Sequence, residues 1–343
     1  MKAIVFEGAN RVSIQEKPIP ELEDGDILIQ VDLCGVCASD LAAIRGEATD
    51  YSPPVVLGHE VAGRVAKTRH PSVRLGQKVT VNPMITCGDC QYCREDLDKY
   101  CQEIVGIGHD IDGGYAEFFK FPRHAIQTGK LISVADTVST IDLMFLEPLG
   151  CCINAMRETI FDQSVAILGA GQIGLIFTQL VKQRGLEVIV IDPINERREM
   201  AEKLGATATF SPHQTEEILE KTNGGTDTVI SATKNNQNAI NLSFEIVRRG
   251  GCLNFFGLSA HDQYLKLNLE QLHFMGHKIM ASWAFSRWSL DQARQTISDQ
   301  KIELEPILSN RFLLSDGLDA LDQVRKNQGI KTAILGKLGN TQI

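Results

Sequence analysis

The sequence predicts an α/β protein in which a doubly wound parallel sheet is joined to a second, β-rich module. Residues 1–123 contain short β-rich runs, such as 27–31 and 76–81, separated by proline and glycine, which is typical of an all-β module. In residues 164–284, apolar strands alternate with helical segments, which is the pattern of a parallel sheet covered by helices. The length of 343 residues exceeds the usual size of one hydrophobic core, so two domains are expected.

Composition excludes several classes of partner. The net charge of −9 argues against nucleic acid, because binding to phosphate backbones is built on clustered Lys and Arg. No apolar run reaches the length of a membrane span, and Glu7 comes too early for a signal peptide. A cytoplasmic protein with no nucleic-acid or membrane partner is therefore expected. Nine cysteines without a secretion signal indicate metal binding or free thiols rather than disulfides.

The first candidate site combines Cys37 and Ser39, from C-A-S-D, with His59 and Glu60, from V-V-L-G-H-E-V-A-G. A thiolate, an imidazole and a carboxylate around zinc leave one position open for substrate. Ser39 is then a candidate proton acceptor. Each residue also has a simpler interpretation: a buried thiol, a turn-forming serine, or a strand end with a solvated acid. The His-Glu pair alone does not decide between these interpretations.

The second candidate site is a cysteine lobe at about residues 84–104. Cys87, Cys90, Cys93 and Cys101 follow the pattern C-x2-C-x2-C-x7-C, and four thiolates so close together can surround one zinc ion tetrahedrally. An iron–sulfur cluster of the bacterial ferredoxin type needs three residues before the fourth cysteine and a proline after it. Here there are seven residues, and Gln102 follows. We therefore predict a structural zinc ion.

A glycine loop follows the strand S-V-A-I-L and opens a helix predicted over 172–184. It matches G-x-G-x-x-G through Gly169, Gly171, Gln172, Ile173 and Gly174. The pattern alone is weak. Between a strand and a helix, however, the glycines allow a tight turn and the close approach of a pyrophosphate to the helix N-terminus.

The predicted cofactor is NAD. Asp192 ends the second strand of this region and can accept hydrogen bonds from the ribose hydroxyls, while its charge would repel the 2′-phosphate of NADP. Arg197 is expected to flank the adenine. Phe256 and Gly257, at the end of G-C-L-N-F-F-G, are also assigned to the cofactor.

Taken together, these motifs resemble those of the zinc-containing medium-chain dehydrogenases, and among them the polyol dehydrogenases of the sorbitol and galactitol-1-phosphate type. The resemblance extends over nearly the whole chain. Its motifs, in the family's order, are C-A-S-D, G-H-E-x-x-G, the four-cysteine lobe, D-G-G-Y-A-E-F (112–118), E-P-L (147–149) and the glycine loop.

The resemblance implies three segments: a GroES-like catalytic domain over 1–150, a Rossmann domain that binds NAD over 151–284, and a return to the catalytic domain over 285–343. It implies an active site in the cleft between the domains, and dimers or tetramers formed through the nucleotide domains. It also implies two zinc ions per chain, one structural and one catalytic.

For the catalytic zinc, the resemblance implies Cys37 and His59 as ligands, with Glu60 and Glu147 as carboxylates that bind directly or through water. Glu147 followed by proline is typical of the polyol type, since ethanol-type relatives carry a cysteine there. One departure concerns the proton relay: relatives commonly place a histidine five residues after the zinc cysteine, where this chain has Ala42.

The expected reaction is hydride transfer between a secondary alcohol of a polyol, cyclitol or sugar derivative and NAD. The alternatives are a non-catalytic homologue that binds NAD and zinc, or a dehydrogenase of simpler alcohols or amino alcohols. The sequence leaves the substrate open. The candidate specificity residues are Arg45, Tyr51, Phe118 and the segment 283–288, and Arg45 or Arg287 is a candidate for binding a substrate phosphate.

Overall fold

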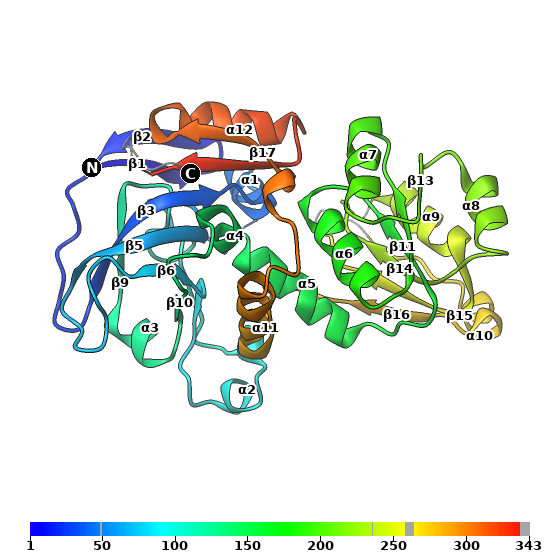
Figure 1. The fold of residues 1–343 in the computed structure, drawn as a ribbon, viewed down its shortest axis with the longest axis horizontal. Coiled ribbons are helices and arrows are strands. Elements are labelled where there is room, and N and C mark those ends of the chain that lie inside the picture. Colours follow the sequence, from blue (N-terminus) through cyan, green and yellow to red (C-terminus); the bar gives the residue numbers. More distant parts are fainter. Residues whose placement is uncertain (49, 235, 258–263, 337–343) are drawn as a thin grey trace. The chain divides into compact units, whose positions relative to one another are not determined.

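The computed structural model describes residues 1–48, 50–234, 236–257 and 264–336. The chain forms two compact units (Figure 1). The first comprises Met1–Gly150 and Ser286–Ile343, and the second comprises Cys151–Phe285. None of the helices in the described part of the chain combines the length and apolarity needed to cross a bilayer.

The first unit is built mainly from short strands. They are β1 (Lys2–Gly8), β2 (Arg11–Glu16), β3 (Ile27–Gly35), β4 (Val55–Val56), β5 (Glu60–Thr68), β6 (Lys78–Val81), β7 (Met84–Ile85), β8 (Val105–Gly106), β9 (Phe118–Phe121), β10 (Leu131–Ser133), β17 (Leu308–Leu313) and β18 (Lys331–Leu335). Its largest sheet has the order β10-β6-β5-β3-β18-β17, and β9 also pairs with β3. The segment that returns at the end of the chain therefore pairs directly with β3 in this sheet.

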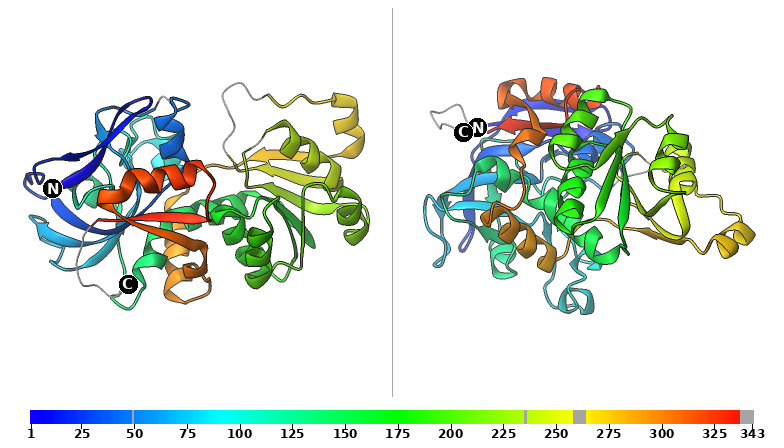
Figure 2. Two further views of the ribbon diagram at one scale, coloured as in Figure 1. Left: turned by 90° about the horizontal axis from the view of Figure 1, so that it is seen from above. Right: turned by 45° about the vertical axis from the view of Figure 1, so that its right-hand side comes forward.

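Helices in this unit are short. They are α1 (Ala38–Ile44), α2 (Gln91–Arg94), η1 (Asp98–Tyr100), α3 (Arg123–Gln127), α4 (Thr140–Met144), α11 (Arg287–Ser298), η2 (Glu305–Ile307), η3 (Leu314–Asp316) and α12 (Gly317–Arg325), with α5 (Leu146–Glu158) continuing into the second unit. Figure 2 shows α12 lying against β17 and β18. Residues 1–123 are rich in strands as predicted, but they are not all-β, because the short helices α1, α2 and η1 interrupt the strands.

Two local details differ from the sequence prediction. The strand predicted over 76–81 begins only at Lys78, because Gly76 has φ +74° and forms a turn. The sequence K-T-A-I-L-G-K-L (331–338) also predicts a closing strand. This strand ends at Leu335, and Lys337 and Leu338 lie outside the described residues.

The second unit is a six-stranded parallel sheet with helices on both faces (Figures 1 and 2). Its elements are β11 (Ser164–Leu168), α6 (Gln172–Gln183), β12 (Glu187–Ile191), α7 (Asn195–Lys203), β13 (Ala208–Phe210), α8 (Thr215–Lys221), β14 (Thr226–Ser231), α9 (Gln237–Ile246), β15 (Val247–Phe255), α10 (Leu269–Met275) and β16 (Lys278–Ala281). The strand order β13-β12-β11-β14-β15-β16 corresponds to the dinucleotide-binding order 3-2-1-4-5-6. The predicted doubly wound sheet is confirmed.

Candidate active site

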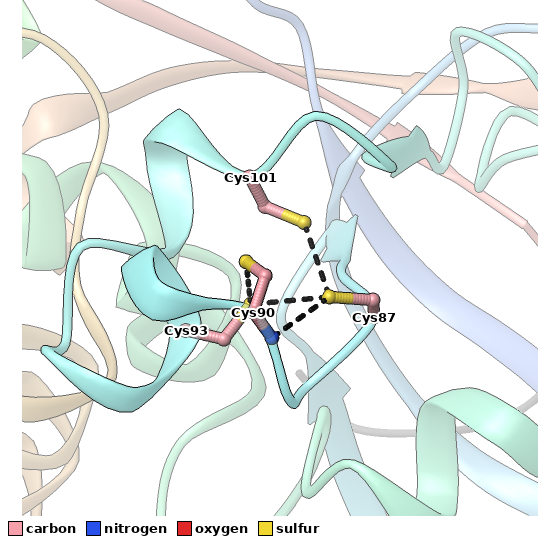
Figure 3. A group of neighbouring side chains, drawn as sticks. All are labelled: Cys87, Cys90, Cys93 and Cys101. Atoms are coloured by element: carbon pink, nitrogen blue, oxygen red, sulfur yellow. Dashed lines mark hydrogen bonds between the residues drawn. The ribbon is translucent and has the colours of Figure 1, made fainter.

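The four cysteines of the lobe converge on one point (Figure 3). Their sulfur atoms lie within 4.8 Å of one another. The Sγ–Sγ distances are 3.8 Å from Cys87 to Cys93, 3.5 Å from Cys90 to Cys93 and 3.6 Å from Cys87 to Cys101. Four sulfurs about 2.3 Å from a central zinc ion would be about 3.8 Å apart. The lobe therefore fits a tetrahedral zinc site, and its sulfurs are too far apart for disulfides.

The thiols of the lobe differ in acidity. The backbone N–H of Cys93 lowers the pKa of Cys90 to about 7. At Cys87, the backbone N–H groups of Asp89 and Cys90 act in the same direction. Burial and side-chain hydrogen bonds outweigh them, and the pKa of the thiol rises to about 12. Closely spaced thiols repel one another when several of them are deprotonated. A bound cation such as zinc would offset this repulsion and favour the thiolate forms.

Two ion pairs of the buried Asp98 attach the lobe to the rest of its unit. Lys130 Nζ lies 2.5 Å from Asp98 Oδ2, and both side chains are almost fully buried. Arg287 Nε lies 3.4 Å from Asp98 Oδ1, and Arg287 also donates to the carbonyl of Cys93. Arg287 is thus engaged with the lobe, which argues against the predicted possibility that it binds a substrate phosphate.

A second group of metal-ligand atoms forms where two paired strands meet. Antiparallel pairing of β3 with β5 places Gly35 opposite Glu60. Cys37 follows the end of β3, and His59 directly precedes β5. Ligand atoms of Cys37, His59 and Glu60 consequently lie within 4.8 Å of one another, as predicted for the first candidate site. A side chain at position 35 would put its Cβ 2.0 Å from Glu60 Oε2, so glycine is required there.

Asp40 orients His59 in this group, although sequence analysis did not assign it a role. The carboxylate is fully buried, with Oδ1 3.6 Å from His59 Nδ1. Oδ2 accepts hydrogen bonds from the Tyr115 hydroxyl at 2.6 Å and from the Cys37 backbone at 3.2 Å. Burial acts to raise the pKa of Asp40, but His59 and Tyr115 outweigh it and the pKa is lowered. A proton on His59 Nδ1 would face Asp40 and leave Nε2 for a metal ion.

Glu60 has a buried partner that the sequence did not reveal. Its Oε2 forms an ion pair with Lys331 of β18, and each side chain is 1% exposed. Lys331 also donates to the Val36 carbonyl at 3.0 Å. Oε1 of Glu60 is buried without a hydrogen bond among the described residues. Lys331 thus holds Oε2 of Glu60 and orients the carboxylate. Oε1 of the same carboxylate is available to a metal ion.

Other predicted residues of this site are less closely gathered. Ser39 lies in the first turn of α1 and is half-buried. Glu147 lies in the first turn of α5 and is half-buried, but it is not in the group whose ligand atoms lie within 4.8 Å. Ala42 lies in α1 and offers no proton-carrying group.

The candidate specificity residues differ in their exposure and in their partners. Arg45 is half-buried and donates two 2.6 Å hydrogen bonds to the Glu47 carboxylate, so its guanidinium is engaged locally. Phe118 lies on β9 opposite Gln30 of β3. The indoles of the segment 283–288 are exposed at Trp283 and Trp288. Tyr51, in contrast, is 8% exposed, and its ring stacks on that of His109.

In the second unit, the glycine loop has the geometry that its pattern predicts. It joins β11 to α6, with Gly169 at φ +96° and Gly171 as the residue preceding the helix. A Cβ on Gly174 would lie 1.8 Å from the Gly169 carbonyl oxygen, so the loop packs tightly against the first turn. Gln172 and Ile173 begin α6. The N-terminus of this helix suits a phosphate group.

Asp192 supports this loop. It is 3% exposed and directly follows β12. Its Oδ2 accepts a hydrogen bond from the Ala170 backbone at 2.7 Å, and Oδ1 accepts one from Ile194 at 2.9 Å. Each carboxylate oxygen has a second acceptor position that remains suitable for a ribose hydroxyl.

The other predicted cofactor residues lie at the same edge of the sheet. Parallel pairing aligns Leu168 with Ser231 and Ser231 with Phe255, so Phe256 and Gly257 follow a strand end close to the glycine loop. A Cβ on Gly257 would lie 1.7 Å from the Thr233 carbonyl oxygen. Arg197 is half-buried on α7. Ligands of doubly wound sheets bind at this carboxyl edge.

Comparison with known proteins gives consistent results. A model described as alcohol dehydrogenase GroES-like domain matches residues 23–130, and one described as zinc-binding dehydrogenase matches residues 173–299. An uncharacterized zinc-type alcohol dehydrogenase-like protein of Haemophilus influenzae is 30% identical over 320 residues, covering 90% of each chain. D-arabitol-phosphate dehydrogenase of Enterococcus avium is 28% identical, covering 95% of this chain and 94% of that protein. The structure of a zinc-binding dehydrogenase of Sinorhizobium meliloti bound to NADP has a TM-score of 0.89 at 27% identity, covering 97% and 98% of the two chains.

Proposed function

The chain belongs to the zinc-type alcohol dehydrogenase family and is an oxidoreductase, and from this premise we propose that it oxidises a secondary alcohol of a polyol, cyclitol or sugar derivative with NAD. The observation that carries the proposal is the group formed by Cys37, His59 and Glu60, whose ligand atoms lie within 4.8 Å of one another. Its three different donors fit an open catalytic site better than a closed structural one.

Each residue of the group has a proposed role. Cys37 and His59 bind a catalytic zinc ion, and Glu60 and Glu147 supply carboxylates directly or through water. When bound, zinc acts as a Lewis acid that polarises the alcohol oxygen and lowers its pKa. Ser39 would relay the proton of the alcohol hydroxyl, accepting it while its own hydroxyl proton passes to water. A bound nicotinamide cofactor would take the hydride from the carbon that carries this hydroxyl.

The buried partners of the ligands support this assignment. Asp40 Oδ1 lies 3.6 Å from His59 Nδ1, where its charge would favour a proton on that nitrogen. Lys331 forms an ion pair with Oε2 of Glu60. Such partners usually change metal affinity or activity by about 10- to 100-fold when they are removed. We therefore include Asp40 and Lys331 among the residues on which activity depends.

For the cofactor, we propose NAD rather than NADP. The buried carboxylate of Asp192 follows β12 beside the glycine loop, and its negative charge would repel a 2′-phosphate. For the substrate, we propose an alcohol without a phosphate group. Arg45 is bound to Glu47 and Arg287 to Asp98, so neither of the predicted phosphate-binding arginines offers an uncompensated charge. A second zinc ion in the cysteine lobe, a dimeric or tetrameric assembly and a cytoplasmic location remain predictions.

The test is reduction of NAD or NADP, followed by absorbance of the reduced cofactor. Polyols, their phosphates and monohydroxy secondary alcohols would be compared with and without a strong chelator. We expect NAD to be reduced with an unphosphorylated polyol, the activity to disappear with the chelator and to return with zinc. A protein that binds NAD and zinc but oxidises none of these alcohols would be a non-catalytic homologue. Equal kcat/KM for polyols and monohydroxy alcohols would instead favour a dehydrogenase of simpler alcohols.

A further inference from the structure

Tyr51 is a buried phenol held between two other rings. It lies in the segment between α1 and β4 and is 8% exposed. His109 stacks on one face, with ring centroids 4.0 Å apart and an interplanar angle of 18°. Phe6 packs edge-on, with a centroid distance of 6.0 Å and an angle of 73°. Two packed neighbours fix the orientation of the phenol before any ligand arrives.

The hydroxyl of Tyr51 is close to the proposed catalytic residues. His109, which stacks on the phenol, also packs against His59 with ring centroids 5.6 Å apart, so the phenol lies one ring away from a proposed zinc ligand. An ordinary phenol is neutral at neutral pH and can both donate and accept a hydrogen bond.

The same hydroxyl makes no hydrogen bond of good geometry within the described part of the chain. Ser39 is near enough to affect its pKa, but the two groups do not meet the distance and angle of a full hydrogen bond. A buried polar group without a partner is unfavourable and rare in folded proteins. A bound hydroxyl compound would provide the missing partner.

His109 connects Tyr51 to the metal group. Its ring packs edge-on against His59 at a centroid distance of 5.6 Å. Its Nδ1 lies 3.9 Å from Asp50, and its carbonyl accepts a hydrogen bond from the Ser52 backbone at 2.9 Å. His109 therefore holds both the ring of Tyr51 and the segment that carries it.

We propose that Tyr51 binds a second hydroxyl of the substrate, next to the hydroxyl that is oxidised, and that His109 positions Tyr51. This inference rests on the proposed function and narrows its substrate class to neutral polyols with neighbouring hydroxyls. A neutral phenol carries no positive charge, so it suits a neutral hydroxyl better than an anionic phosphate. Sites built to hydrogen-bond a substrate hydroxyl strongly reject analogues that lack it.

The test compares the holoenzyme with Tyr51→Phe, which removes one oxygen and keeps the ring. We expect the ratio of kcat/KM for a vicinal diol, such as 2,3-butanediol, to that for 2-butanol to fall about tenfold or more. Calorimetric binding of the diol to enzyme saturated with NADH should weaken by a similar factor. Tyr264→Phe is the matched control, because that tyrosine is 71% exposed in the other unit and should leave the ratio unchanged.

The role of His109 is tested by two substitutions. His109→Ala should lower the diol to 2-butanol ratio of kcat/KM about as much as Tyr51→Phe does. His109→Phe should keep most of the wild-type ratio, because the stacked ring is kept. Thermal midpoints and zinc contents would establish that the variants fold. An unchanged ratio in folded Tyr51→Phe, or an equal loss for both alcohols, would overturn the inference while the proposed function stands. A wild type that oxidises no alcohol would overturn the proposed function and, with it, this inference.

Discussion

The cysteine lobe and the group formed by Cys37, His59 and Glu60 both bring metal-ligand atoms within 4.8 Å, but in different ways. All four ligands of the lobe lie within fifteen consecutive positions, from Cys87 to Cys101. The group of Cys37, His59 and Glu60, called the mixed group below, depends instead on two strand ends that are brought together by sheet pairing. The lobe can thus be specified by spacing alone, whereas the mixed group exists only after its unit has folded.

The surroundings of the two groups differ as well. In the lobe, the sulfurs are near one another and near backbone N–H groups, such as that of Cys90, which donates to Cys87 Sγ. In the mixed group, two ligands have buried charged partners, Asp40 for His59 and Lys331 for Glu60. Metal binding in the lobe should therefore mainly affect folding, whereas changes around the mixed group should affect both the chemistry and, through the buried charges, the stability of the unit.

The largest effect is expected for Cys90→Ser in the lobe. Loss of one thiolate should lower zinc content by about one ion per chain from an expected total of about two. Because binding of a structural zinc ion contributes directly to folding, the yield and thermal midpoint should fall more than the kcat of the remaining folded enzyme. Metal analysis and thermal unfolding measure both quantities.

Cys252→Ser is a suitable control, because Cys252 is a buried thiol outside both metal groups. It should keep the full zinc content. A wild type with one zinc ion, or a Cys90→Ser protein with unchanged zinc, would contradict the two-site model.

The next largest effect is expected for Lys331→Met in the mixed group. The substitution leaves the carboxylate of Glu60 buried without its cation, which typically costs about 3–5 kcal/mol of stability. Adding Glu60→Gln should recover part of this loss, because the buried charge is removed. Urea unfolding of the single and double variants measures this coupling.

Lys326→Met provides the matched control. Lys326 pairs with Asp322 at 2.6 Å, but its side chain is 57% exposed, and exposed pairs contribute about 0–1 kcal/mol. If Lys331→Met costs no more than Lys326→Met, the buried pair does not stabilise the unit as inferred.

Glu147→Gln should have a smaller free-energy effect, and it tests whether the mixed group extends beyond its three gathered ligands. If Glu147 belongs to the carboxylate set of the catalytic zinc, kcat should fall about 100-fold, while the lobe keeps its zinc and NAD still binds. If Glu147 only favours the N-terminus of α5, the substitution costs less than about 1 kcal/mol of stability and turnover is normal. A variant with full kcat and full zinc would remove Glu147 from the active site.

The sequence predicted the features that depend on local spacing. The doubly wound parallel sheet and the glycine loop follow from strand and helix periodicity, and the cysteine lobe follows from four closely spaced thiols. Cys37, His59 and Glu60 of the first candidate site lie together because C-A-S-D and G-H-E lie next to paired strands, while the role of Ser39 stays a prediction. Contacts between distant segments were not predictable in this way.

Lys331 and Tyr51 illustrate this limit. Lys331 reaches Glu60 because β18 pairs with β3, and nothing in the local sequence K-T-A-I-L marks its first residue as buried. Tyr51 was one of several candidates, and only tertiary packing against Phe6 and His109 distinguishes it. Arg45 and Arg287 looked suitable for phosphate because a sequence does not show which side chains already have partners.

In the second unit, Asp192 is a buried carboxylate like Glu60, but it has different partners. A lysine compensates Glu60, whereas both oxygens of Asp192 accept backbone N–H groups, from Ala170 and Ile194. Backbone donors carry no full positive charge, so Asp192 retains a negative field that can select against a 2′-phosphate. Asp192 should therefore serve both as a support for the loop and as a selector of the cofactor.

The smallest effect is thus expected for Asp192→Ala, as a change in cofactor preference. NAD should bind more weakly because the ribose loses an acceptor, while NADP is relieved of a repulsive charge. The ratio of kcat/KM for NAD over NADP should fall about tenfold, or about 1.4 kcal/mol.

Asp192→Asn separates the two roles, because it removes the charge but keeps one oxygen acceptor for the loop. Asp192→Asn should thus shift the ratio in the same direction with a smaller loss of stability. If neither variant changes the ratio, Asp192 supports the loop but does not contact the ribose.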